Sequence, residues 1–348
     1  MKILYAIQGT GNGHLSRAMD IVPLLKKMAD VDVLVSGVQG DLILPFPVKY
    51  QFKGLGFMFG KSGGVDMYST FVKMKSKRLY NEVKQLPVTD YDLVISDFEP
   101  VSAWACYAAD KECISLSHQT AVTSSKSPKP KNFDLIGQMV LRYYAPSTSQ
   151  YGFHFERYDS NIYTPVIRQQ VRYAKVSTME HITVYLPSFD DDRLIKSFSR
   201  FKGIKWQIFS KHNKKPVFMK HITILPIQNE LFIDSMASSN GVICGAGFET
   251  PAEALFLGKK LLVIPMKGQY EQHCNAAALR KMGVAVIKSL KQKHDTTIEE
   301  WLKNGKRMEV NYPDETQHIL EQIISKHWKA PSPTDIAIQW DKELEMES

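Results

Sequence analysis

The sequence predicts an α/β protein with two parallel-sheet domains, and three observations carry this prediction. The chain has 348 residues, which at roughly 100–200 residues per domain corresponds to two domains. Short β-rich runs alternate with segments of helical periodicity, as in parallel strands joined by helical crossovers. In each half, a glycine-bearing turn follows a strand and precedes a helix, which is where open α/β sheets bind ligands.

The expected elements follow in chain order. We expect strands at 3–7, 31–35, 93–96 and 113–116, then at 182–186, 206–209, 222–225, 242–244, 261–265 and 284–287. Helical periodicity is clear after the first strand and again near the end, where Ile319, Ile323 and Ile324 share one face. The stretch 144–172 is rich in Tyr, Pro and Ser and lacks periodicity, so the linker between the domains is expected there, with the boundary near 160–175.

Composition excludes several classes of protein. Apolar residues make up 44% and charged residues 23% of the chain, which is typical of a folded globular protein. The four cysteines form no C-x-x-C pair, which argues against a disulfide framework or a zinc site and fits a reducing cytoplasm. The formal charge of +8 suits an anionic ligand or a lipid surface but is too diffuse to indicate nucleic acid.

Membrane association is expected to be peripheral at most. The apolar start of the chain runs into Gly9 after a few residues, too short a stretch for a signal peptide. No later apolar run approaches the roughly 18 residues needed to cross a bilayer. We therefore expect a cytoplasmic protein and leave contact with the inner face of the membrane open.

The first turn, residues 9–14, reads Gly-Thr-Gly-Asn-Gly-His. Its backbone N–H groups would line the positive end of a helix and bind an anion. A dehydrogenase is rejected because His14 replaces the last glycine of G-x-G-x-x-G and the next strand ends at Ser36 rather than in an acid. A tight turn without a ligand remains the alternative. The candidate anion-binding residues are Gly9, Gly11, Asn12 and Gly13.

The second turn, residues 245–253, again joins an apolar strand to a helix. Thr250 as N-cap, Pro251 at the first helical position and Glu253 three residues after the cap predict a capping box. The free N–H groups of this helix suit a diphosphate. Glu253 either caps the helix or turns outward to a ribose. The candidate donor-binding residues are Gly245, Ala246, Gly247, Phe248, Glu249, Thr250 and Glu253.

A third loop, after the strand at 261–265, carries hydrogen-bonding side chains. Gln269, Glu271 and Gln272 lie there, and carboxylate and amide groups suit the vicinal hydroxyls of a sugar ring. As isolated residues they are more often simply solvated.

Residues 241–276, with G-x-G-F-E-T, Pro-Ala-Glu and P-x(5)-EQ-x-x-N, resemble the nucleotide-sugar signature of GT-B glycosyltransferases. The similarity is to UDP-glycosyltransferases and to the transferase that adds N-acetylglucosamine to the lipid-linked peptidoglycan precursor. Residues 9–17 are similar to the glycine-rich turn of their first domain. The resemblance implies two Rossmann-like domains facing each other across a cleft: an acceptor-side domain at 1–160, a donor-side domain at 170–312, and a last helix at about 313–329 crossing back.

The resemblance also implies roles for single residues. Glu253 matches the ribose-binding Glu, Glu271 and Gln272 match the sugar-binding pair, and Thr250 matches a phosphate-contacting hydroxyl. One departure is Gly245, which stands where plant enzymes have a phosphate-binding His. The phosphates here would therefore rely on backbone N–H groups.

His14 and Asp97 are the candidate catalytic residues. His14 matches the His after the glycine-rich turn, and Asp97 ends a strand where the family often has an acid. An imidazole can remove the proton of an acceptor hydroxyl, and a carboxylate on the other ring nitrogen fixes its tautomer. Binding of an acceptor phosphate by His14 is the alternative. His118, at another strand end, is at least as readily a structural residue.

The sequence therefore predicts a glycosyltransferase that moves a sugar from a nucleoside diphosphate, most simply UDP, to a hydroxyl acceptor with inversion. We expect no metal and no cofactor besides the donor, because Asp190, Asp191 and Asp192 stand near a helix start rather than in a donor loop. The acceptor is not identified, and a lipid- or phosphate-linked compound is one candidate. A sugar-nucleotide epimerase and a non-catalytic nucleotide-sugar-binding protein are the alternatives.

Overall fold

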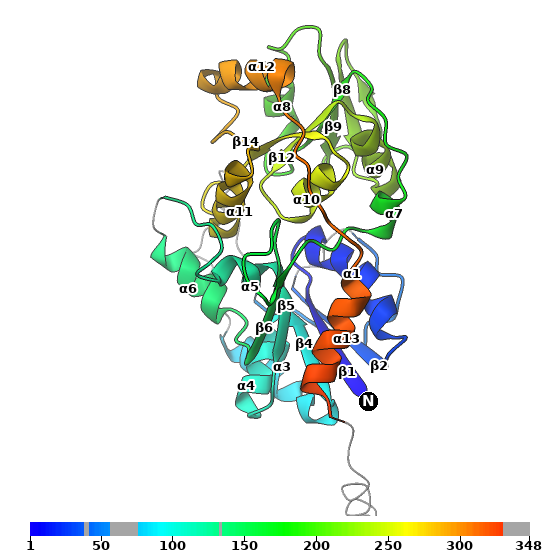
Figure 1. The fold of residues 1–348 in the computed structure, drawn as a ribbon, viewed down its shortest axis with the longest axis vertical. Helices are drawn as coiled ribbons and strands as arrows, with labels where there is room; N and C mark the ends of the chain where they lie inside the picture. Colours follow the sequence, from blue (N-terminus) through cyan, green and yellow to red (C-terminus); the bar gives the residue numbers. More distant parts are fainter. Residues whose placement is uncertain (38–41, 56–75, 132–133, 330–348) are drawn as a thin grey trace, which may run out of the picture.

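The computed structural model describes residues 1–37, 42–55, 76–131 and 134–329, which form two α/β lobes (Figure 1). Within these ranges the first lobe holds a seven-stranded, wholly parallel sheet of order β3-β2-β1-β4-β5-β6-β7. Its strands are β1 (Lys2–Gln8), β2 (Asp30–Ser36), β3 (Tyr50–Phe52), β4 (Leu93–Asp97), β5 (Ile114–Ser117), β6 (Ser149–Phe153) and β7 (Ile162–Tyr163).

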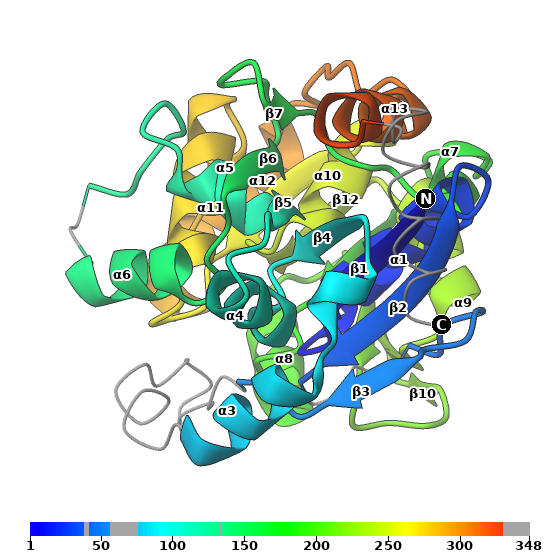
Figure 2. The same ribbon diagram turned by 90° about the horizontal axis from the view of Figure 1, so that it is seen from below.

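Helices follow these strands as crossovers. They are α1 (Asn12–Leu25), α3 (Ser76–Gln85), a 3-10 turn (Val88–Asp90), α4 (Pro100–Ala108), α5 (His118–Thr123) and α6 (Leu135–Tyr143). Seen from below, β3 lies at one edge of the sheet and β7 at the other (Figure 2). The Ile3–Ile7 run of β1 is fully buried, as expected for a central parallel strand that is covered on both faces.

The second lobe repeats the plan. Among the described residues its sheet has seven strands in the order β10-β11-β9-β8-β12-β13-β14, parallel except for the β10–β11 pair. Its strands are β8 (His181–Tyr185), β9 (Lys205–Ser210), β10 (Val217–Phe218), β11 (Ile222–Pro226), β12 (Gly241–Gly245), β13 (Lys260–Ile264) and β14 (Ala285–Val286). Its helices are α8 (Asp191–Phe198), α9 (Asn229–Ser238), α10 (Glu249–Phe256), α11 (Tyr270–Lys281), a 3-10 turn (Gln292–His294) and α12 (Asp295–Asn304).

All ten expected strands are present, because each is a continuous apolar run long enough to be buried. The stretch 144–172 is more structured than expected, because β6 and β7 lie in it and pair in the first sheet. These strands were missed because β6 contains polar residues and a glycine. The first sheet ends at Tyr163 and the second begins at His181, and the short helix α7 (Gln169–Arg172) lies between them.

The last described helix, α13 (Thr316–His327), returns to the first lobe. It lies beside α1 (Figure 1) and buries Ile319, Leu320 and Ile323. The Tyr151 hydroxyl of β6 lies 2.8 Å from Nε2 of His327. The chain therefore crosses between the lobes twice.

The strand order of each sheet fixes the position of the site. In the first sheet the order reverses between β1 and β4, and in the second between β8 and β12. Loops at such a point diverge to opposite faces and leave a crevice at the carboxyl ends of the strands. The turns after β1 and β12 are the two glycine-bearing turns singled out in the sequence.

Candidate active site

A cavity of about 260 Å³ lies between the two lobes. Four helices, α1, α5, α10 and α11, begin at residues 12, 118, 249 and 270, so their first turns surround it. The first lobe lines it with Gln8, Thr10, Gly11, Gly13, His14, Phe98, His118, Gln119, Gly137, Val140 and Leu141. The second lobe lines it with Gly247, Phe248, Glu249, Gln269, Tyr270, Glu271 and Gln272.

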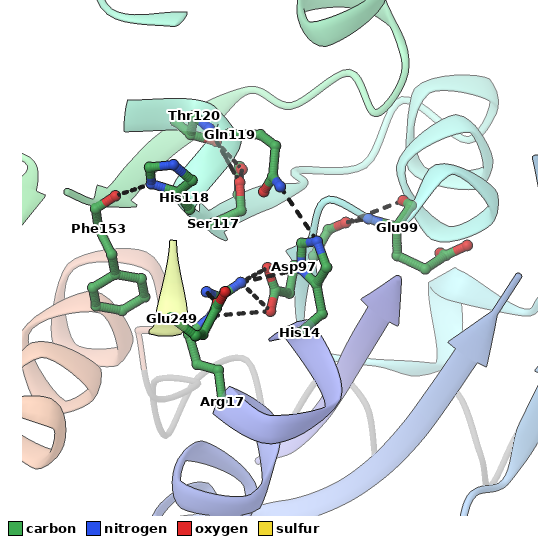
Figure 3. A network of polar contacts seen from close by, with 12 residues as sticks. His14, Arg17, Asp97, Glu99, Ser117, His118, Gln119, Thr120, Phe153 and Glu249 are labelled. Atoms are coloured by element: carbon green, nitrogen blue, oxygen red, sulfur yellow. Dashed lines mark hydrogen bonds and ion pairs between the residues drawn. The ribbon is translucent and has the colours of Figure 1, made fainter. Parts of the chain in front are cut away.

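His14 and Asp97 lie together at the cavity wall, as the sequence suggested. β1 and β4 are adjacent parallel strands with Ile7 opposite Asp97, so their following turns meet at one edge. Nδ1 of His14 lies 2.9 Å from Oδ1 of Asp97 (Figure 3). Asp97 is fully buried beneath the ring, whereas His14 lines the cavity. This is the geometry of an imidazole oriented by a carboxylate.

Arg17, one helical turn after His14, also binds Asp97. Its Nη2 lies 2.6 Å from Oδ1 and 2.8 Å from Oδ2, and its Nε lies 3.2 Å from Oδ2. Burial by itself raises the pKa of Asp97, but the charges of Arg17 and His14 outweigh it and hold the pKa below its ordinary value. Asp97 is therefore ionised throughout the neutral range.

The same guanidinium crosses to the second lobe. Nη1 of Arg17 donates to Oε1 of Glu249 at 2.6 Å. Glu249 is the first residue of α10, inside the turn predicted to bind the donor. Arg17 thus connects the carboxylate that orients His14 with the predicted donor loop.

Gln119 makes a second connection across the cavity. Its Nε2 donates to Oε2 of Glu271 at 2.9 Å and lies 3.3 Å from Nε2 of His14. The ring nitrogen of His14 that does not face Asp97 therefore points toward Gln119 and the cavity.

His118 is a buried packing residue at the interface. Its Nδ1 donates to the Phe153 carbonyl oxygen at 2.8 Å, and its Nε2 lies 2.8 Å from Oδ1 of Asn275. Its ring stacks on Phe248 with centroids 3.8 Å apart. Burial lowers the pKa of His118, although Glu271 and the oxygens that face both nitrogens act in the opposite direction. A structural role therefore accounts for its contacts.

The predicted capping box at the start of α10 is wrong. The helix begins at Glu249, its N-cap is Phe248, and no side chain caps it. The carboxylate of Glu253 instead binds Arg168 of the linker at 2.5 and 2.7 Å. A buried carboxylate is stabilised more by a bidentate pair with a guanidinium than by a hydrogen bond from one backbone N–H. Because Glu253 is paired with Arg168, the first N–H groups of α10 have no side-chain partner.

The residues at the start of α11 partly face the cavity. Gln269, Glu271 and Gln272 all line it. Oε1 of Gln272 accepts a hydrogen bond from the Met266 N–H at 2.8 Å, and Oε1 of Gln269 is buried without a partner. Glu271 is held by Gln119, as described above. The helix has no side-chain N-cap.

The first glycine-rich turn has two different uses for its glycines. The Gly9 N–H donates to the Ser36 carbonyl oxygen at 2.6 Å, and a Cβ there would lie 2.8 Å from Val35 Cγ1, so Gly9 serves packing against β2. A Cβ on Gly13 would lie 2.5 Å from Oε2 of Glu249. Gly13 is therefore where the second lobe approaches the first turn of α1.

The structure brings only part of the predicted set into the cavity. Nine predicted residues line it: Gly11, Gly13, His14, Gly247, Phe248, Glu249, Gln269, Glu271 and Gln272. Asp97 lies behind His14. Six others do not line it: Gly9, Asn12, Gly245, Ala246, Thr250 and Glu253.

Sequence reasoning missed Arg17, Gln119, Tyr270 and Arg168 as site residues. For Arg17 a signal existed, because residues three apart on a helix share a face and His14 stands three positions earlier. No comparable local signal marked Arg168, whose partner Glu253 is 85 residues away.

The acidic run 190–192 stands at the start of α8. Asp190 caps α8 by accepting from the Arg193 N–H at 2.8 Å, as expected for acids at a helix start. Among the described residues, no three His, Cys, Asp or Glu side chains are arranged to hold a metal ion. In the same part of the chain, no helix is both long and apolar enough to cross a membrane.

Sequence comparison identifies related proteins along most of the chain. The family profile described as glycosyl transferase family 1 matches residues 1–305. A protein of Methanosarcina mazei described as an uncharacterized glycosyltransferase is 22% identical over 328 residues, which cover 81% of this chain and 84% of that protein.

Solved structures share the fold at low sequence identity. Phytolacca americana UGT2, complexed with UDP-2-fluoro-glucose and pterostilbene, is 12% identical with a TM-score of 0.54, covering 100% of this chain and 99% of its own. Acinetobacter baumannii MurG is 13% identical with a TM-score of 0.52, covering 93% and 99%. At this identity the likeness concerns architecture, and it confirms the GT-B fold of two facing Rossmann-like domains.

Proposed function

Because the chain belongs to glycosyl transferase family 1 and is a glycosyltransferase, we propose that it moves a sugar from a UDP-sugar to a hydroxyl acceptor, with inversion and without a metal. One observation carries the proposal. The His14–Asp97 pair of the first lobe faces the uncapped first turns of α10 and α11 of the second lobe across one cavity.

The donor is assigned to the second lobe. The first-turn N–H groups of α10 and α11 lack side-chain caps, and such helix starts favour anions such as a diphosphate. Glu271 and Gln272 line the cavity beside them and suit sugar hydroxyls. Solved relatives in complex with UDP and UDP-2-fluoro-glucose support UDP as the nucleotide.

Glu253 remains our proposed ribose ligand, with Arg168 as the residue that holds it. The Glu253 side chain is 3% exposed and bound to Arg168, and Glu253 lies one turn beyond Glu249 on α10. Glu253 does not line the cavity, so the assignment requires Arg168 to release one oxygen of this carboxylate to the ribose hydroxyl.

His14 is proposed as the base. Its Nε2 removes the proton of the acceptor hydroxyl as the acceptor oxygen bonds to the anomeric carbon. The bond from that carbon to the diphosphate breaks, and its electron pair leaves on UDP. Asp97 stabilises the imidazolium that forms, and the helix starts stabilise the charge on the diphosphate. A single direct displacement inverts the anomeric centre.

An apolar, lipid-linked acceptor is proposed from the apolar part of the cavity wall in the first lobe. Phe98, Val140 and Leu141 line this part of the cavity, so α6 faces the cavity with apolar side chains. Its outer side is also apolar and exposed: Leu135 is 55%, Ile136 58%, Met139 52% and Tyr143 57% exposed. The exposed Arg142 stands in the last turn of the same helix, which suits an anionic lipid surface.

Incubation with a panel of UDP-sugars tests the proposal. We expect UDP release only when a lipid-linked hydroxyl acceptor is supplied. An isomerised sugar without acceptor would instead indicate an epimerase, and donor binding without any turnover would indicate a binding protein.

A further inference from the structure

The cavity has a charge problem for the ligand proposed above. Among the described residues that line it, two are carboxylates, Glu249 and Glu271, and none is Lys or Arg. A diphosphate brings at least two more negative charges, and unpaired charge in a partly buried site is strongly unfavourable. The helix starts of α10 and α11 supply only partial positive charge, so a full cation close behind the lining residues would add to the stabilisation of the diphosphate.

Arg17 is the cation that fits. Its side chain is 2% exposed, and it lies directly behind Glu249. The guanidinium uses separate atoms for its two carboxylate partners, because Nη1 binds Glu249 whereas Nη2 and Nε bind Asp97. Departure of Glu249 therefore frees Nη1 and leaves the pair with Asp97 intact.

Glu249 is also the partner that can leave. Its side chain is 26% exposed, whereas Asp97 is fully buried. Its carboxylate lies over Gly13 in the first turn of α1, where a Cβ would come within 2.5 Å of Oε2. That turn has no acidic residue and no side-chain cap of its own. A carboxylate from the other lobe thus lies against this uncapped turn while it is paired with Arg17.

We propose that Arg17 and the first turn of α1 form an anion site. In the absence of ligand the Glu249 carboxylate occupies this site, and a ligand phosphate displaces it. Phosphate and carboxylate oxygens make the same charge-assisted hydrogen bonds to a guanidinium. The inference rests on the proposed function for the identity of the ligand. It adds that Arg17 binds the phosphate and that Glu249 competes for the same atom, Nη1.

Inorganic pyrophosphate is the probe, because it tests the anion site without a nucleoside or a sugar. Calorimetry would compare the wild type with Glu249→Gln, and with Glu271→Gln as the matched control, since Glu271 lines the same cavity but binds the uncharged Gln119. We expect pyrophosphate affinity to rise about tenfold in Glu249→Gln, by about 1.4 kcal/mol. The rise in Glu271→Gln should be less than about threefold, from the general change in charge.

Arg17 variants complete the test. Arg17→Gln should lower pyrophosphate affinity by about tenfold and abolish the gain from adding Glu249→Gln. Arg17→Gln also removes the buried partner of Asp97. If this variant does not fold for that reason, Arg17→Lys is the second variant: it keeps the positive charge but not the bidentate guanidinium, and it should still weaken pyrophosphate binding severalfold.

The outcomes separate this inference from the proposed function. Equal effects of Glu249→Gln and Glu271→Gln, or no pyrophosphate binding by any variant, would overturn the displacement even if the wild type transfers sugar from UDP. If the variants show the expected order of pyrophosphate affinities but the wild type does not bind UDP, the displacement is supported and the assignment of UDP as the nucleotide is refuted.

Discussion

Nδ1 of His14 lies 2.9 Å from a carboxylate oxygen of Asp97, although 83 residues separate them in the chain. The pair forms because β1 and β4 are neighbours and end at the same sheet edge. The other ring nitrogen, Nε2, is left on the cavity side, 3.3 Å from the Gln119 amide.

Replacement of His14 by Ala should lower kcat by about 10²–10⁴. UDP affinity should stay nearly unchanged, because the donor is assigned to the helix starts of the second lobe and to Arg17, and not to the His14 ring. Steady-state kinetics with donor and acceptor varied separately, together with calorimetry for UDP, measure both quantities. A raised acceptor KM with kcat largely preserved would mean that His14 binds an acceptor phosphate instead.

Asp97→Asn should also lower kcat, by about 10²–10⁴, because the amide does not hold the required tautomer or stabilise an imidazolium. Glu99→Gln is the matched control, since Glu99 is a fully buried acid just after the same strand whose carboxylate caps α4 through the N–H groups of Val101 and Ser102. Comparable losses of kcat in both variants would point to a general packing defect.

Glu253→Ala should weaken UDP binding by about 1–3 kcal/mol if the carboxylate binds the ribose. Arg168→Ala provides the comparison, because it removes the partner that holds Glu253 at 2.5 Å but leaves the carboxylate in place. Thermal unfolding would establish that both variants fold. Unchanged UDP affinity in a folded Glu253→Ala variant would end the ribose assignment and leave the residue a purely structural role.

Acidification should destabilise the protein through His154. Its Nδ1 accepts from the Phe155 N–H at 2.8 Å and its Nε2 has no partner. Burial, helped by His118 and Lys129, lowers its pKa well below the usual value. His154 therefore binds a proton more readily in the unfolded chain than in the folded protein. The folded state keeps its full stability above about pH 6.5, the ordinary pKa of histidine, and loses stability as the pH falls toward the lower pKa of the folded state.

The melting temperature, measured from about pH 7.5 to 5.5, should therefore fall more steeply in the wild type than in His154→Asn, whose amide oxygen can still accept from Phe155. The exposed His212 supplies the control variant His212→Asn, expected to follow the wild type. Parallel slopes for wild type and His154→Asn would contradict the prediction.

Met139→Glu on the outer side of α6 should reduce binding to anionic lipid vesicles, because it places a negative charge on the face proposed to contact the membrane. Phe218→Glu is the control, since Phe218 is exposed at 77% but lies in the second lobe. Cosedimentation with vesicles measures the difference. Equal binding by both variants would remove the lipid surface from the proposal while leaving sugar transfer intact.

The sequence by itself determined the units of the fold. Buried parallel strands are continuous apolar runs, and the helices after them carry a periodic apolar face, so both signals are local and all ten expected strands are present. Short, partly polar strands such as β6 and β7 gave no such signal. The pairing of His14 with Asp97 was also predictable, because strand ends in a parallel sheet meet at one edge.

Only the tertiary structure decided which charged groups share partners. Arg17 and Glu249 are 232 residues apart, and Arg168 and Glu253 are 85 apart. The local pattern around Glu253 predicted a cap, yet the linker supplied a stronger partner. Ion pairs of this kind depend on how the two sheets face each other. That arrangement is set by the packing of the lobes, which no run of neighbouring residues encodes.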